Sequence, residues 1–328
     1  MNIKSILRNI RFLALLIGNM MMAGCSNSDK PAYLEPHLIT TEATHITRTE
    51  ATLNGSATIE GETEMPKLLF RYGTSESMDL NTSEVHAQGA DVSLVLTGLK
   101  AGTTYYYMLQ GNNGRITTTS NMMSFTTLPN MSPKLTSATL LSHGPMSAFV
   151  SYEITDDGGE PMTETGCYVY QTGEPENKQK YILENFDGKE GKIKLRIGNL
   201  ERNAHYEFQP FARNTVGETI GTAIKYNTSD AITLNETGEL TQLMGNHLYD
   251  YTQLTIAGTL NGEDLSCLRL MMGRDNNNAS TPGKLSDIVL TDVHLAAGGM
   301  VGPYHHEAAD NQIVQGTFAG CEKPTHVV

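Results

Sequence analysis

The sequence predicts a mainly β protein, with two β-sandwiches in tandem followed by a shorter α/β segment. The chain of 328 residues contains 31 glycines, and only 18 % of its residues are charged. That composition is typical of short strands joined by turns rather than of long helices. Apolar and polar residues alternate over residues 41–128 and again over residues 131–228, and one tyrosine motif occurs in both segments. These observations predict one sandwich in each segment.

The first predicted sandwich spans residues 41–128. Apolar residues recur at every second position in three runs, at residues 51–59, 68–72 and 92–96, with Gly55 interrupting the first run. A period of two places one face of a strand on a core and the other face in water. Glycines separate these runs, so we expect short strands joined by turns.

A tyrosine motif links the two segments. Tyr105 follows Leu99 by six residues, and Tyr206 follows Leu200 by the same interval, 101 residues further along the chain. An internal repeat at that distance indicates two copies of one sandwich domain. Both motifs resemble the E–F corner of fibronectin type III domains. The resemblance implies that Tyr105 and Tyr206 are structural corners whose hydroxyl groups hydrogen-bond to upstream backbone.

The second predicted sandwich spans residues 131–228 and carries a further phrase. A glycine pair at 158–159 is followed by Gly166, Cys167 and Tyr168. This arrangement resembles fibronectin type III-like repeats of surface proteins from gut Gram-negative bacteria. The chain departs from the best-known members of the family because it has no tryptophan. We expect Leu53 to take the place of the strand-B tryptophan in the first sandwich.

Residues 229–328 have a different pattern. We expect a helix over 236–245, a strand over 252–257, a second helix over 262–272 and a strand near residue 288. This succession looks like a solenoid, and its phrases resemble the start of BspA-type leucine-rich repeat regions in bacterial surface proteins. The phrase Thr-Phe-Ala-Gly-Cys at 317–321 is followed there by a strand, here expected from Val327. The resemblance implies an incomplete leucine-rich-repeat-like segment, which we expect to be the least stable part of the chain.

The N-terminus predicts export and a lipid anchor. Residues 1–11 are basic, and the apolar run 12–24 is too short for the roughly 20 residues that span a bilayer. Such a segment is typical of a secretory signal peptide, here residues 1–24. Ala23 and Gly24 precede Cys25, which resembles the lipobox of bacterial lipoproteins, although Met22 stands where leucine is usual. An ordinary signal peptide with an incidental cysteine is the alternative.

The lipobox resemblance implies a diacylglycerol thioether on Cys25, with residues 25–40 as a tether. Stable anchoring follows from several acyl chains. Ser26, rather than an aspartate, follows the cysteine. By the same resemblance, this favours the outer membrane over the inner one. We therefore expect an exported outer-membrane lipoprotein. Exposure on the cell surface is the favoured interpretation, and a periplasmic orientation is the alternative.

The net charge narrows the class of partner. The whole chain carries a formal charge of −13, and removal of Lys4, Arg8 and Arg11 with the signal peptide leaves −16. Such a surface repels phosphate backbones, so we expect no nucleic-acid partner. It also argues against simple electrostatic adhesion to anionic lipid.

A group of histidines and acids near the C-terminus contains possible metal ligands. His305, His306, Glu307 and Asp310 cluster in a glycine-rich stretch. Adjacent histidines cannot both face one metal from a regular element, and the sequence has no HExxH motif. We expect a solvated loop there rather than a metal site.

Three other groups of residues could also bind a ligand, and each has a structural interpretation beside the functional one. Asp156 and Asp157 precede a glycine pair, but no alternating oxygen pattern follows, so a β-turn is favoured over a calcium loop. Residues 276–278 are three asparagines, which we interpret as a loop. Tyr106 and Phe211 point to the face opposite the predicted cores, so they are the aromatic residues most open to a sugar.

Three cysteines remain after Cys25, namely Cys167, Cys267 and Cys321. An odd number cannot pair completely. Buried free thiols on strands are the favoured interpretation, which the resemblance supports for Cys167 and Cys321. A bridge between Cys267 and Cys321 is the alternative.

No catalytic motif, metal site or cofactor fingerprint is recognisable in the sequence, whereas catalytic carboxylate pairs meet only in the fold. We therefore predict a non-enzymatic surface lipoprotein that presents binding modules to a host protein or glycan. By resemblance, the repeat family mediates adhesion. The alternatives are an accessory glycan-binding lipoprotein of a polysaccharide-capture system and an unrecognised enzyme.

Overall fold

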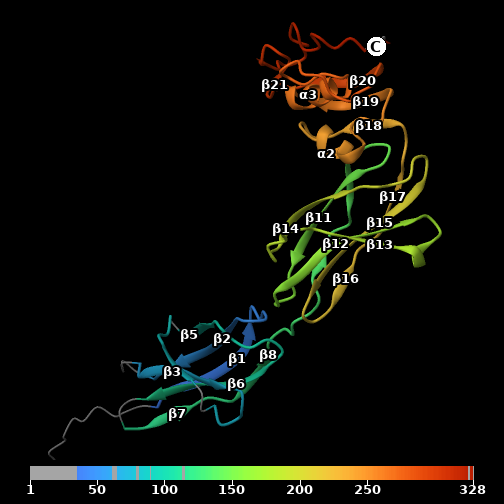
Figure 1. Ribbon diagram of the computed structural model, residues 1–328. Helices are drawn as coiled ribbons and strands as arrows, with labels where there is room; N and C mark the ends of the chain where they lie inside the picture. Colours follow the sequence, from blue (N-terminus) through green and yellow to red (C-terminus); the bar gives the residue numbers. More distant parts are fainter. Residues whose placement is uncertain are drawn as a thin grey trace, which may run out of the picture. The chain divides into compact units, whose positions relative to one another are not determined.

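The computed structural model describes residues 35–60, 65–78, 81–88, 90–112, 115–323 and 326–327. These residues form two compact units that divide between Pro129 and Asn130 (Figure 1). The prediction of a mainly β chain is confirmed. Within the described residues, no helix is both long enough and apolar enough to cross a membrane.

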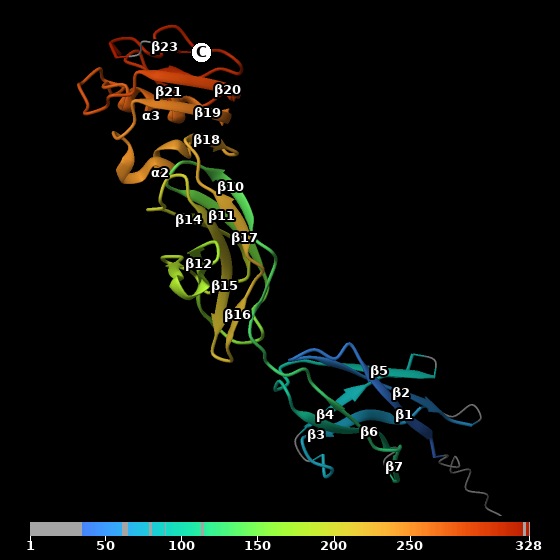
Figure 2. The same cartoon turned by 90° about the vertical axis from the view of Figure 1, so that its right-hand side faces the viewer.

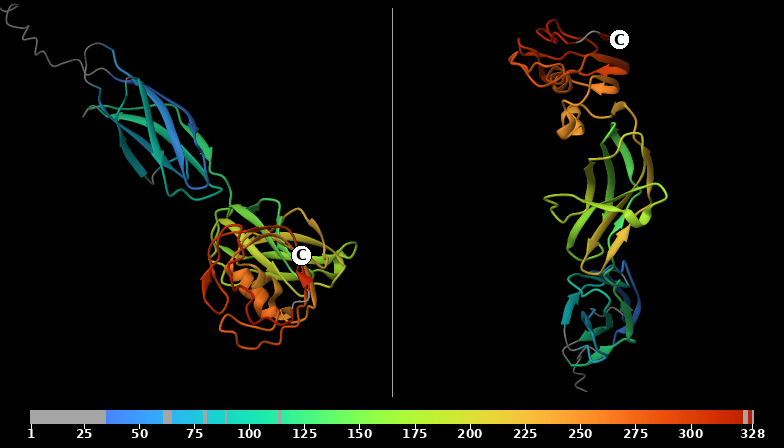
Figure 3. Two further views of the ribbon diagram at one scale, coloured as in Figure 1. Left: turned by 90° about the horizontal axis from the view of Figure 1, so that it is seen from above. Right: turned by 45° about the vertical axis from the view of Figure 1, so that its right-hand side comes forward.

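The first unit is a sandwich of two antiparallel sheets (Figure 3). One sheet has the order β1-β2-β5, formed by β1 (His37–Thr44), β2 (Ala51–Thr58) and β5 (Asp91–Leu96). The other has the order β4-β3-β6-β7 with β8 also on β6, formed by β4 (Asn81–Val85), β3 (Lys67–Gly73), β6 (Thr104–Asn112), β7 (Thr117–Thr119) and β8 (Met123–Thr126). Leu53 and Phe70 are fully buried between the sheets, together with Tyr107.

The close approach of β1 to β2 depends on a glycine. A Cβ at Gly55 would lie 2.6 Å from the carbonyl oxygen of Ile39, because the two strands pair at Thr40 and Gly55. The interruption of the apolar period at Gly55 is therefore a packing requirement rather than a turn.

The second unit begins with a sandwich of the same plan. One sheet contains β9 (Lys134–Leu135), β10 (Thr139–His143), β11 (Ala148–Asp156) and β14 (Gly191–Ile197). The other has the order β13-β12-β15-β16 with β17 on β15, formed by β12 (Met162–Gln171), β13 (Gln179–Ile182), β15 (His205–Asn214), β16 (Glu218–Ile220) and β17 (Ile224–Asn227). The 3-10 turn η1 (Pro175–Asn177) connects β12 to β13.

The two sandwiches share one strand order. The series β1-β2-β5 corresponds to β10-β11-β14, and β4-β3-β6 corresponds to β13-β12-β15. Each pair of sheets is the Greek-key arrangement of an immunoglobulin-like sandwich of the fibronectin type III kind. Leu53, expected to replace the tryptophan of that fold, has no exposed surface.

The sheet of the second sandwich continues into the C-terminal segment. β18 (Ala231–Leu234) pairs antiparallel with β10, at His143 and Thr233. β19 (Gln253–Leu260), β20 (Asp287–Leu295) and β23 (His326–Val327) then follow as parallel strands. One sheet thus has the order β14-β11-β10-β18-β19-β20-β23 (Figure 2). We call the strands β18, β19 and β20 the parallel ladder.

Two short helices cover one face of the parallel ladder. They are α2 (Leu240–Met244), followed by the 3-10 turn η2 (Gly245–His247), and α3 (Gly262–Met271), and a hairpin of β21 (Met300–Val301) and β22 (His306–Glu307) lies beyond them. These positions are close to the expected ones, although the expected helix over 236–245 is shorter in the structure. Crossovers between parallel strands need such helices or long loops.

The C-terminal segment and the second sandwich share a core. Phe149 of β11 packs in the same buried cluster as Leu243 of α2 and Leu254 of β19. The guanidinium of Arg196 donates hydrogen bonds to the carbonyls of Gln242 and Leu243 at the end of α2. A cation and donors at that end satisfy carbonyls that the helix leaves unpaired. The expected boundary between residues 228 and 229 therefore lies inside one compact unit.

A buried arginine holds the last described turn in place. Arg269 of α3 has no exposed surface. Its Nη1 donates to the carbonyls of Thr317 at 2.7 Å and Ala319 at 3.0 Å, and its Nη2 donates to the carbonyl of Asp275 at 2.8 Å. The phrase at 317–321 is thus attached to α3 by a charged side chain that pairs with backbone.

Candidate functional site

The expected anchor lies outside the described residues. These exclude residues 1–34, so the signal peptide, Cys25 and most of the tether receive no structural account. Export and lipidation stay predictions.

The two corner tyrosines make equivalent contacts. The hydroxyl of Tyr105 accepts a hydrogen bond from the amide of Lys100 at 2.9 Å. The hydroxyl of Tyr206 accepts one from the amide of Glu201 at 3.0 Å. In both cases the donor lies five residues upstream, so each tyrosine ties the loop that precedes its own strand.

The histidine-rich stretch gathers no metal-ligand cluster within the described residues. The side chains of His305, His306 and Glu307 are exposed. Asp310 is engaged elsewhere, since its Oδ1 accepts the amide of Ala297 at 2.8 Å.

The structure does bring together three carboxylates, Asp156, Asp157 and Glu190, with oxygen atoms within 4.8 Å of one another. Glu190 was not anticipated, because it lies 33 residues from Asp157 in the chain. The oxygens already have partners. Asp156 and Asp157 accept amides of the following turn, Glu190 accepts the amide of Asp157, and the ammonium of Lys134 lies 3.6 Å from Asp156. The cluster stabilises a turn.

The cysteines and outward aromatics offer little chemistry. Cys167, Cys267 and Cys321 are free thiols in the structure. Burial raises the pKa of Cys167 and of Cys267 to about 12, which keeps both protonated and unreactive at neutral pH. Phe211 is fully buried beneath Tyr168, with ring centroids 4.8 Å apart, so the expectation that it is open to a sugar is wrong. Tyr106 is half-buried.

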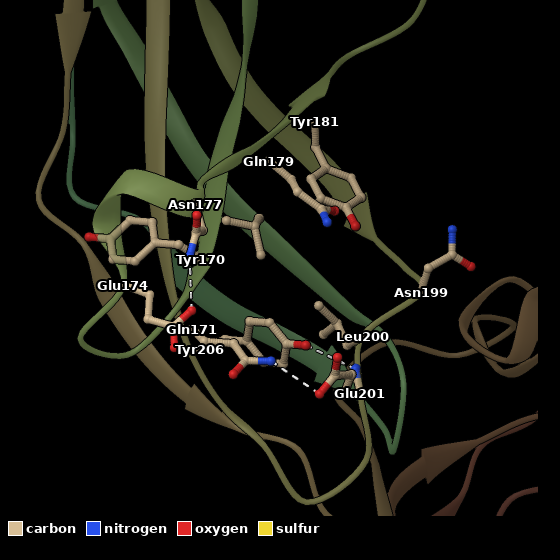
Figure 4. Close-up of a pocket in the computed structure, with 11 residues that line it drawn as sticks. Tyr170, Gln171, Glu174, Asn177, Gln179, Tyr181, Asn199, Leu200, Glu201 and Tyr206 are labelled. Carbon is tan, nitrogen blue, oxygen red and sulfur yellow. Dashed lines mark hydrogen bonds between the residues drawn. The ribbon is translucent and has the colours of Figure 1, made fainter.

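A pocket of about 200 Å³ lies in the second sandwich, where the loop after β14 meets the end of β12, η1 and β13 (Figure 4). We call it the β12 pocket. It is lined by Val169, Tyr170, Gln171, Glu174, Asn177, Gln179, Tyr181, Asn199, Leu200, Glu201 and Tyr206.

The inner wall of the β12 pocket belongs to the sandwich core. Val169, Leu200 and Tyr206 are buried members of one hydrophobic cluster. Tyr181 packs against that cluster and donates its hydroxyl to the carbonyl of Gly198 at 2.6 Å. Because these side chains are held by the core, the wall is preformed.

The rim of the β12 pocket consists of amide and carboxylate side chains. Gln171 donates to Glu201 at 3.1 Å, and Asn177 donates to Glu174 at 3.1 Å (Figure 4). The amide of Gln179 and that of Asn199 complete the rim. No lysine, arginine or histidine lines the pocket among the described residues. The site therefore suits neutral, hydroxyl-bearing chemistry better than anions.

Sequence reasoning did not find the β12 pocket. Its residues come from segments around 170, 177, 200 and 206. Leu200 and Tyr206 belong to the tyrosine motif, which predicts a structural corner and not a pocket, and the other segments carry no recognisable motif. The one local signal is the polar stretch around η1, which resembles any solvated loop.

A second depression, of about 320 Å³, lies on the ladder face that α2 and α3 leave uncovered. It is lined by Asp230, Gln253, Leu254, Thr255, Asp287 and Val289. The strand register places Ala231 beside Thr255 and Thr255 beside Val289. This row of small or β-branched side chains, with acids at one end, forms the outward ladder face.

The comparisons with known proteins found neither a matching family model nor a matching curated protein. Solved structures do match. A two-domain fibronectin type III segment from chicken tenascin is 18 % identical with a TM-score of 0.30, and the match covers 58 % of this chain and 99 % of that one. Chicken CNTN1 FN1-FN3 domains are 13 % identical with a TM-score of 0.25, covering 59 % and 68 %.

A bacterial structure also matches. The sensor domain of the anti-sigma factor RsgI4 of Pseudobacteroides cellulosolvens is 23 % identical with a TM-score of 0.24, and the match covers 29 % of this chain and 95 % of that one. At these scores, none of the likenesses bears on function. The fibronectin type III-like assignment depends on the strand order of the two sandwiches.

Proposed function

We propose that this protein is a non-enzymatic, membrane-anchored surface lipoprotein that binds a partner through the outward ladder face. In this proposal, acyl chains on Cys25 hold the chain in the outer membrane. The first sandwich then acts as a spacer. The second sandwich and the parallel ladder act together as the recognition module, and the partner is a host protein.

The observation that carries this proposal is the fusion of the parallel ladder to the sandwich sheet. β18 pairs with β10, so the ladder continues the sheet of the second sandwich. A short repeat array needs a neighbour on which to bury its apolar face. The core shared through Phe149 supplies that neighbour.

The spacing of the strands supports a leucine-rich-repeat-like interpretation. β18, β19 and β20 start at residues 231, 253 and 287, which gives intervals of 22 and 34 residues. The first falls within the usual repeat length of about 20–29 residues, and the second accommodates an insertion. Solenoids of this kind bind partners on exposed strand faces. The outward ladder face is the corresponding surface here.

A substitution at the centre of the outward ladder face tests the proposal. Thr255 lies between Ala231 and Val289, so Thr255→Arg places a long cation across the row. We expect cells that display this variant to lose at least tenfold in adhesion to immobilised extracellular-matrix proteins. The matched control is Thr119→Arg, at an exposed position on β7 of the first sandwich. Equal adhesion by both variants and the parent would contradict the proposal.

Surface display needs its own experiment. Whole cells that express the full chain are treated with protease, and the protein is followed with an antibody to residues 229–328. We expect loss of the antibody signal in intact cells. Protection in intact cells, with digestion only after lysis, would place the protein on the inner side of the membrane.

A further inference from the structure

We propose that the β12 pocket is a binding site for a single neutral sugar residue, such as the terminal residue of a glycan. The site is separate from the outward ladder face, so this inference goes beyond the proposed function. It depends on the shape of the pocket, its donors and acceptors, and its charge.

The wall of the β12 pocket offers a sugar ring one half-buried aromatic side chain, Tyr181, because Val169, Leu200 and Tyr206 are themselves almost completely buried. Leu200, Tyr206 and Tyr181 are fixed by the core or by a backbone hydrogen bond. A pyranose has a C–H face that packs on aliphatic and aromatic surface, while its hydroxyls point sideways. The pocket volume of about 200 Å³ is below the range of drug-sized ligand sites and matches one ring rather than a longer oligomer.

The rim of the β12 pocket offers donors and acceptors in pairs. Gln171 is bonded to Glu201, and Asn177 is bonded to Glu174. An amide has two N–H donors and a carbonyl acceptor, and a carboxylate has about four acceptor sites. One bond within each pair leaves both kinds of group available. Vicinal hydroxyls both donate and accept, so they can use such mixed pairs.

The charge of the β12 pocket disfavours anionic ligands, and its mixture of donors and acceptors favours a neutral ligand over a cation. With two carboxylates and no cationic side chain in its lining, the pocket repels phosphates and carboxylates. An ammonium ligand would be attracted by the carboxylates, but it has only donors and could not accept from the exposed amide N–H groups of the rim, which would stay bonded to water. A neutral polyol satisfies both kinds of rim group.

The inference is tested by saturation-transfer NMR on the full chain, in a detergent that contains no sugar. The probes are the methyl glycosides of glucose, galactose, mannose and N-acetylglucosamine. A ligand of this size should bind with a dissociation constant on the order of 1 mM. We expect at least one glycoside to bind, with transfer strongest at its ring C–H protons.

Variants locate the binding. Asn177 and Gln179 are exposed rim residues, so the double variant Asn177→Ala/Gln179→Ala should fold normally, which an unchanged melting temperature would show. We expect its affinity for the glycoside to fall at least tenfold. The matched control is Gln242→Ala, which removes an exposed amide on α2 outside the pocket and should bind as the parent does.

Three results would overturn the inference. No glycoside binds, or the double variant binds as well as the parent, or methylammonium competes with the glycoside at equal concentration. The outcome is also independent of the proposed function. Thr255→Arg should leave glycoside binding unchanged, and the pocket variant should leave adhesion through the ladder unchanged.

Discussion

A buried carboxylate joins the start of α2 to the start of α3, and its replacement tests how much this link contributes to stability. Asp264 on the first turn of α3 has only 1 % of its surface exposed. Its Oδ2 accepts the amides of Gly238 at 2.7 Å and Asn261 at 3.0 Å, and its Oδ1 accepts the amide of Leu240 at 3.0 Å. One side chain thus joins the start of α2 to the start of α3.

The substitution Asp264→Asn keeps the size of the side chain and removes one acceptor. If the amide oxygen takes the Oδ2 position, its NH₂ group faces the amide of Leu240, which is left without a partner. A stranded buried donor costs about 1–3 kcal/mol, and the two remaining hydrogen bonds lose their charge assistance. We expect a total loss of about 2–4 kcal/mol. For a unit of about 200 residues, this lowers the melting temperature by roughly 4–16 °C.

The assay is scanning calorimetry of the full chain, combined with hydrogen exchange at residues 238–241. The control is Glu263→Gln, which removes a neighbouring negative charge from the same helix turn at an exposed position. It should change the stability by less than about 1 kcal/mol. If Asp264→Asn costs no more than Glu263→Gln, the three hydrogen bonds do not hold the two helices together.

Further outcomes follow from the same structure. Cys25→Ala should abolish labelling of the protein by a fatty-acid analogue, whereas labelled Cys25→Ala protein would disprove the lipobox. Tyr105→Phe and Tyr206→Phe should each cost about 1 kcal/mol in chemical denaturation, since each removes one hydroxyl acceptor and little volume; no loss at either site would mean that the corners contribute nothing. Phe149→Ala should cost about 3–5 kcal/mol and shift one shared calorimetric transition of residues 130–328; a second transition that stays in place would separate the sandwich from the ladder. Burial lowers the pKa of His143 from its ordinary 6.5, so on acidification the imidazole is protonated in the unfolded chain before it is protonated in the folded one. Stability of this unit should therefore decline as the pH falls below about 6.5, and His143→Gln should flatten that part of the profile; an unchanged profile in the variant would assign the decline to other groups.

Local sequence patterns predicted which strand faces are buried and where the two tyrosine corners lie. Alternation around Leu53 and Phe70 reports which side of a strand is buried, and both residues are fully buried in the first sandwich. The six-residue interval before Tyr105 and Tyr206 reflects a loop of fixed length, and both hydroxyls meet the backbone five residues upstream. Such features are legible because the residues that make them are neighbours in the chain.

The β12 pocket could not be read in this way. Gln171 and Glu201 are 30 residues apart and meet only because β12 and the loop after β14 converge. The burial of Phe211 was misjudged for a related reason. Alternation showed that its side chain leaves the core, but Lys180 and Tyr168 cover it from outside. Period-two reasoning has no information about what covers the outer face of a sheet.

The sequence by itself determined the mainly β class of the chain, the tyrosine corner of each sandwich and the presence of helices and strands after the second sandwich. Each depends on residue spacing within a run of about ten residues, because the period of the backbone decides which positions of the run face the core. Only the tertiary structure decided that β18 joins β10, that Phe149 serves a core with α2 and β19, and that the β12 pocket exists. Those features arise where segments far apart in the chain meet, and such meetings are selected by the free energy of the whole packed unit rather than by any local pattern.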